Sequence, residues 1–234
     1  MPFDVTRKTV GFEPAGSMIG FPSNPVPYVL KPDEEFTKGD MVKFEYGKVT
    51  KADSSDTDGI LGVMAESVKQ EDNPKEKRTK ALVYDDPHRV YRVTFETKDD
   101  NEFEATGGAS DGSTVIASSG PGNDNTFRGG LLYVYEGTNK GCVRTVKEFA
   151  ESTNTFTVEK PFPKECDDTT KFIVLGDNSA ADRPINVGTK AKLEDEAKVD
   201  SNADPSDGPL FVREIYPEEL MMDVVVGMSS HVIN

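Results

Sequence analysis

The sequence is poor in the side chains on which most metal and nucleophile sites depend. It has no tryptophan, two histidines and two cysteines among 234 residues. The cysteines, Cys142 and Cys166, form no CxxC pair, so a zinc site built on these thiols would need ligands from elsewhere. A single disulfide between them and two unrelated buried thiols both stay open. We therefore expect no cofactor.

The chain also lacks long apolar runs and an excess of positive charge. No stretch approaches the ~20 apolar residues of a membrane-spanning helix, and the first residues hold no apolar run typical of a signal peptide. Acidic residues outnumber basic ones by 42 to 27, for a formal net charge of −15. Such a chain repels phosphate backbones. We expect a protein made in a cytosol, with no membrane and no nucleic acid as partner.

One motif matches a hydrolase signature. GASDG, Gly108 to Gly112, satisfies G-x-S-x-G, in which Ser110 would be a nucleophile on a tight strand-to-helix turn. The following STVIASSG is rich in β-branched residues and serine, which does not favour a helix. Only His88 and His231 could serve as the base. We therefore predict that the chain is not an enzyme.

Two acidic loops begin like calcium-binding loops. Asp200, Asn202 and Asp204 have the alternating oxygens of such a loop, but Pro205 replaces the required glycine and Phe211 occupies the twelfth position. The loop that starts at residue 54 similarly lacks a twelfth-position glutamate. We interpret both as turns stabilised by short polar side chains, and we predict no metal site.

Proline is concentrated at the N-terminal end of the chain. Residues 1–30 hold five prolines and little periodicity, which predicts an extended arm because proline fixes the backbone and removes a donor. The arm either lies on its own fold or reaches a neighbouring molecule.

Short strands and turns fill most of the remaining sequence. Val42, Phe44 and Tyr46 alternate with charged residues, as in a half-buried strand, and Tyr46-Gly47 is a turn signal. Five strands are predicted between residues 103 and 176. Residues 146–150 fit a strand or a single helical turn, and residues 192–199 fit a strand or a short helix.

These patterns predict a mainly β protein. We expect a discontinuous β-sandwich or barrel domain, residues 31–94 plus 177–234, closed by C-terminal strands from 210–216 and 222–228. Residues 95–176 form an inserted, small β-barrel-like domain, and residues 1–30 form the proline-rich extended arm.

The stretch FTKGDMVKFEYGKVTKADSSDTDGILGVMAESV, residues 36–68, resembles the head decoration (cement) proteins of tailed bacteriophages. The resemblance is carried by Gly39-Asp40-Met41-Val42, Gly47-Lys48-Val49 and Gly59-Ile60-Leu61-Gly62-Val63. Residues 127–162 similarly look like β modules of phage virion proteins. The chain is longer than the small single-domain decoration proteins.

The resemblance implies a non-enzymatic virion protein on the outer capsid surface. Its partner would be the phage major capsid protein, whose neighbouring subunits it would cement, often as a homotrimer. The alternatives are another virion part, such as a tail-tube, neck or fibre-associated protein, and a host-glycan-binding module. The residues that we expect to contact the capsid are Phe12, Phe21, Pro25, Pro27, Tyr28, Gly39 and Asp40.

Overall fold

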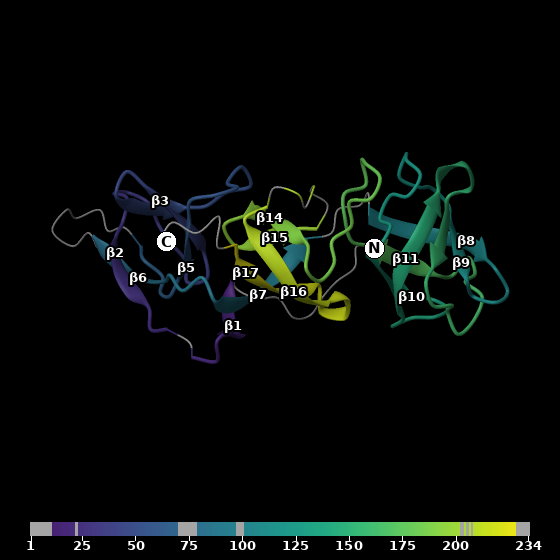
Figure 1. Ribbon diagram of the computed structural model, residues 1–234, viewed down its shortest axis with the longest axis horizontal. Coiled ribbons are helices and arrows are strands. Elements are labelled where there is room, and N and C mark those ends of the chain that lie inside the picture. Colours follow the sequence, from purple (N-terminus) through teal and green to yellow (C-terminus); the bar gives the residue numbers. More distant parts are fainter. Residues whose placement is uncertain are drawn as a thin grey trace.

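The computed structural model describes residues 11–21, 23–69, 79–96, 101–201, 204, 206 and 208–227, and in this part the protein is built from β-strands. No α-helix occurs among these residues. Figure 1 shows three β units in a row: a five-stranded sheet, a central barrel and a second barrel. The mainly β prediction, with one barrel inserted into a discontinuous one, is confirmed. Residues 1–10 of the predicted arm lie outside the described residues.

The first unit is a curled five-stranded sheet in the order β2-β6-β5-β3-β4. Its strands are β2 (Val26–Val29), β3 (Met41–Glu45), β4 (Lys48–Lys51), β5 (Ile60–Met64) and β6 (Lys80–Tyr84). β3 and β4 form the predicted hairpin. Tyr46 and Gly47 both have positive φ, 47° and 79°, which suits a two-residue turn matched to the twist of the strands.

The central unit is a discontinuous barrel. It consists of β7 (Arg89–Glu96), β14 (Lys190–Asp195), β15 (Lys198–Asp200), β16 (Leu210–Tyr216) and β17 (Met221–Val226), and β17 pairs back onto β7 to close it. β1 (Glu13–Ser17) adds to the first half of β7. Of the two predicted closing strands, β17 pairs with a strand from before the insertion, as predicted, whereas β16 pairs with β14 and β17. Two strands and a turn cover residues 192–199, so the helix alternative is wrong.

The second barrel has six strands and is closed. They are β8 (Glu102–Gly108), β9 (Thr114–Ala117), β10 (Leu131–Glu136), β11 (Val143–Ala150), β12 (Thr155–Val158) and β13 (Lys171–Val174), in the order β10-β11-β12-β9-β8-β13. Five strands had been expected, and β8 is the sixth. Residues 146–150 belong to β11, not to a helical turn. Buried phenylalanine rings fill this barrel.

Buried apolar contacts join the three units. The core of the central barrel also contains Met41 and Val63 from the first sheet and Ile173 and Leu175 from the second barrel. An ionic contact adds to the first junction: the Lys51 ammonium lies 2.7 Å from a Glu196 carboxylate oxygen. Whether the predicted ranges 1–30, 31–94 plus 177–234, and 95–176 are independent domains stays a prediction.

A cluster of Arg92, Asp223 and Tyr216 holds three strands of the central barrel together. The Arg92 guanidinium donates to both oxygens of Asp223 at 2.8 and 2.9 Å and to the Tyr216 hydroxyl at 2.8 Å. It also lies 4.3 Å from the centre of the Tyr216 ring. Asp223 is only 8% exposed, so these hydrogen bonds replace the contacts with water that its carboxylate loses on burial.

Replacing Arg92 with leucine is expected to lower the free energy of unfolding by about 2 kcal/mol, because the carboxylate of Asp223 loses its only charged partner among the contacts described above. Tyr216→Phe, which removes one hydroxyl and keeps the ring, should cost about 1 kcal/mol. Urea unfolding measures both. Equal losses for the two variants would contradict the assigned role of the charge.

Candidate interaction surface

Three of the predicted capsid-contact residues are buried in the chain itself. Phe12 is 1% exposed and Asp40 is 4% exposed. The backbone amide of Phe12 donates to the Gly39 carbonyl at 2.8 Å, which fastens the start of β1 to the first sheet. Asp40 accepts from the Thr37 amide at 2.8 Å. Phe12, Gly39 and Asp40 therefore lie where the start of β1 meets the first sheet. A substitution at one of them would affect binding of a partner by changing the shape of this junction.

The other four predicted residues lie closer to solvent. Phe21 is 82% exposed, and Pro27 is exposed on β2. Pro25 and Tyr28 are half-buried. The Tyr28 hydroxyl donates to Asp85 at 2.7 Å, and burial together with that carboxylate raises the pKa of Tyr28. Only Phe21 therefore presents a large apolar side chain almost wholly to solvent.

Phe21 is part of an exposed apolar segment that follows β1. Met18 and Ile19 are 50% and 57% exposed. The Met18 amide donates to the His88 carbonyl at 2.8 Å, which ties the segment to the start of β7. Gly20 then turns the chain at φ 79°. A short apolar turn is therefore held outward from the central barrel. Its apolar side chains stay exposed to solvent in the isolated chain, as at sites that bind another molecule.

A groove opens beside this apolar turn. It has a volume of about 460 Å³ and is lined by Met18, His88, Phe211, Arg213, Val225 and Gly227, among others. Phe211 and Val225 face each other across β16 and β17. Gly188, which also lines the groove, follows Val187, a side chain that is 58% exposed. The lining is mostly apolar, with Arg213 as its cation.

Sequence reasoning did not single out this groove. Met18 and Ile19 lie within the proline-rich arm, and their run with Phe21 was the available signal. Val187, Phe211 and Val225 come from distant parts of the chain and reach this surface only through barrel closure. No local pattern in the sequence brings them together.

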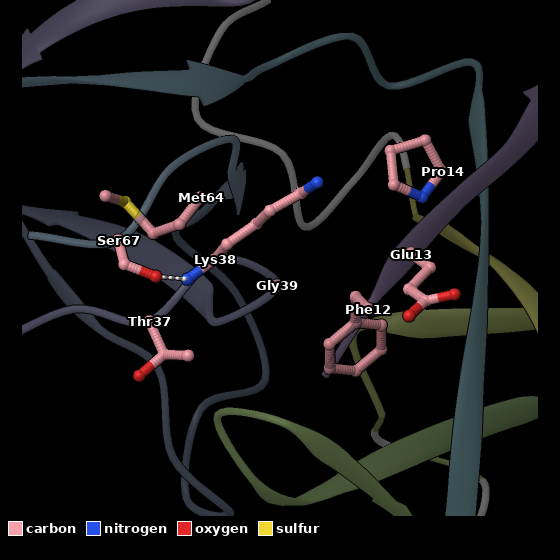
Figure 2. A pocket seen from close by; sticks show the side chains of 8 residues that line it. All are labelled: Phe12, Glu13, Pro14, Thr37, Lys38, Gly39, Met64 and Ser67. Carbon is pink, nitrogen blue, oxygen red and sulfur yellow. Dashed lines mark hydrogen bonds between the residues drawn. The ribbon is translucent and has the colours of Figure 1, made fainter. Parts of the chain in front are cut away.

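A second hollow lies where β1 meets the first sheet. It has a volume of about 580 Å³, and Figure 2 shows Phe12, Glu13 and Pro14 on one side and Thr37, Met64 and Ser67 on the other. The Lys38 side chain extends between them, while its amide donates to the Ser67 hydroxyl at 2.8 Å. The charged groups of this hollow are the Lys38 ammonium and the Glu13 carboxylate, and these two do not form a nucleophile–base pair.

Cations of the protein itself occupy the two acidic loops. In the loop after β4, the Lys43 ammonium lies 2.8 Å from Asp56 and 3.6 Å from Asp53. In the loop that begins at Asp200, Arg183 pairs with Asp204 and lies 3.4 Å from Asp177. Asn202 and Pro205 of this loop lie outside the described residues. Within the part of the chain that the structure describes, no group of three or more His, Cys, Asp or Glu residues could hold a metal ion.

The remaining candidate groups are separate from one another. Ser110 is exposed in the turn between β8 and β9, whereas His88 lies on the central barrel beside β7; His231 falls outside the described residues. Cys142 and Cys166 are both free thiols. Burial raises the pKa of Cys166, whose sulfur accepts from the Asn139 amide at 3.3 Å.

Several exposed carboxylates have pKa values below their ordinary range in the folded protein. A hydrogen bond from the Ser55 hydroxyl lowers the pKa of Asp53. Hydroxyl groups of Thr169 and Ser113 lower the pKa values of Asp167 and Asp111 in the same way. A carboxyl whose folded pKa is depressed contributes stability above its unfolded pKa of about 4 and loses it as the pH falls through the folded value. Burial raises the pKa of Asp40, which acts in the opposite direction.

We expect the urea midpoint to change little between pH 8 and pH 5 and to fall below about pH 4, because the depressed carboxyls outnumber the raised one among those described. Urea titrations at fixed ionic strength, repeated at each pH, measure this. A midpoint that rises on acidification would show that the raised carboxyl dominates.

Comparison with known proteins gives no match: no protein family fits the sequence, and no curated protein or solved structure is similar to it. No helix in the described residues is long and apolar enough to cross a membrane.

Proposed function

We propose that this chain is a non-enzymatic structural protein of a tailed-phage virion. It binds the outer surface of the capsid and cements neighbouring subunits of the major capsid protein, as a homotrimer. The observation that carries the proposal is the exposed apolar turn Met18, Ile19 and Phe21 beside an apolar groove. Exposed apolar surface of this kind is typical of sites that bind another protein.

Three further features support the proposal. The described residues form a continuous series of β units with shared buried contacts, a build that suits a rigid clamp. Lys43 and Arg183 pair with aspartates of the two acidic loops, so these loops have ionic contacts within the protein itself. Weak contacts at each site add up when many copies bind a regular lattice, so a modest apolar surface suffices for stable attachment.

The experiment that tests the proposal locates the chain in purified particles by quantitative gel analysis and cryo-EM. The proposal expects density on the outer head surface and a copy number comparable with that of the major capsid protein. Low copy number at the neck or fibres, or position along the tail tube, would instead assign the chain to another virion part. Absence from the particle would overturn the virion role and leave host-glycan binding as the alternative to test on glycan arrays.

A further inference from the structure

The groove on the central barrel is lined by an arginine in addition to its apolar residues. Arg213 lies on β16 at a break in its pairing with β17, between Val212 and Glu214, and its side chain is exposed. It forms no ion pair with any described residue. The Lys190 ammonium lies 6.0 Å from the centre of the ring of Phe211, which lines the groove.

This local positive charge contrasts with the rest of the chain. The protein carries a formal net charge of −15, and Arg92 and Arg183 have carboxylate partners. His88 lines the groove, and its Nδ1 lies 3.5 Å from a carboxylate oxygen of Asp86. The Asp86 carboxylate therefore contacts His88 and forms no ion pair with Arg213. An exposed guanidinium beside apolar walls favours a ligand that pairs one carboxylate with apolar groups.

The walls of the groove suit an extended segment. Two glycines line it, so a bound backbone can approach closely on those sides. Gly188 has open space where a side chain would project. At Gly227, an added Cβ would lie 3.0 Å from the Phe211 ring, so a side chain there would crowd the floor of the groove.

We propose that this groove binds an extended apolar peptide segment carrying an aspartate or glutamate, with the carboxylate on Arg213 and the apolar side chains against Phe211, Val225 and Met18. Within the proposed function, on which this inference rests, the segment belongs to the capsid protein. A second copy of this chain is the alternative occupant, and a self-association measurement separates it from a capsid peptide.

A random heptapeptide library displayed on a carrier and panned against the full chain tests the proposal. Enriched peptides are expected to combine apolar residues with at least one acidic residue. Their affinity should fall about tenfold for Arg213→Glu, which reverses the charge, and fall for Met18→Ser, which removes apolar surface from a side chain that is already half exposed.

Lys147→Glu is the matched control, because it makes the same charge change at an exposed position on β11 of the second barrel. It should leave peptide affinity unchanged. The proposal is overturned if no peptide is enriched, if the enriched peptides lack acidic residues, or if they bind Arg213→Glu as tightly as the parent chain. Concentration-dependent self-association that Arg213→Glu abolishes would assign the groove to a second copy and overturn it as well.

The proposed function and the assignment of the groove can fail independently of each other. If the chain is absent from virions but binds acidic, apolar peptides through Arg213, the proposed function fails and the groove assignment stands. If the chain decorates the head but the library yields no groove-dependent peptide, the groove assignment fails and the proposed function stands.

Discussion

Replacing Gly62 with alanine is expected to destabilise the first sheet strongly. Gly62 lies in the middle of β5, between β3 and β6, at φ 155°. An added Cβ would lie 1.9 Å from the carbonyl oxygen of Tyr84, a backbone atom that cannot rotate away. Either β5 and β6 separate or the chain distorts, so we expect a loss of about 3 kcal/mol in the free energy of unfolding.

Gly47→Ala is the matched control for this prediction. Gly47 also has positive φ, 79°, but nothing lies within 4 Å of the added Cβ. Its cost should be about 1 kcal/mol, from backbone conformation alone. Urea unfolding of both variants separates the steric cost from the conformational one. Equal losses would show that β5 and β6 can shift freely and that the close approach is not required.

Truncating Phe156 to alanine is expected to have the largest effect on the second barrel. Phe156 is fully buried, and its ring centre lies 4.5 Å from that of Phe149, 5.4 Å from that of Phe103 and 5.6 Å from that of Phe172. Removing a ring from the middle of such a cluster leaves a cavity bounded on several sides, so we expect a loss of about 3–5 kcal/mol.

Calorimetry and hydrogen exchange together measure this effect. The amides of β11 and β12 should exchange faster in the Phe156→Ala variant, while those of β3 and β5 in the first sheet should change less. Phe44→Ala, at a side chain that is 38% exposed, is the control and should cost about 1 kcal/mol or less. A loss for Phe156→Ala no larger than that of Phe44→Ala would contradict the central position assigned to its ring.

Local sequence patterns predicted many of the strands and turns, but they did not predict the groove on the central barrel. Alternation through Val42 and Phe44, followed by Tyr46-Gly47, identified the hairpin of β3 and β4, because period and turn chemistry are both local. β8 was missed as a strand, since its sequence EFEATGG ends in two glycines and contains few β-branched residues. The helix alternatives failed because both segments pair with the strand next to them in the sequence, β11 with β12 and β14 with β15.

The separation of the N-terminal half into two sheets also depends on distant pairing. β7 follows β6 closely in the chain, yet it leaves the first sheet and pairs with β17, whose residues lie more than a hundred positions further on. For the same reason, the residues of the groove could not be grouped from the sequence. A turn motif in the sequence predicts Gly39 and Asp40 as contact residues, but it does not predict the internal hydrogen bonds that both make.

Binding of the chain to purified phage heads that lack it tests directly whether the apolar turn attaches the protein to the capsid. Phe21→Asp places a charge on the most exposed residue of the apolar turn, and Tyr46→Asp makes the same type of change at a residue that is 97% exposed on the first sheet. The account predicts that occupancy at a fixed protein concentration falls about tenfold or more for Phe21→Asp and stays unchanged for Tyr46→Asp. Equal occupancy of the two variants would contradict it.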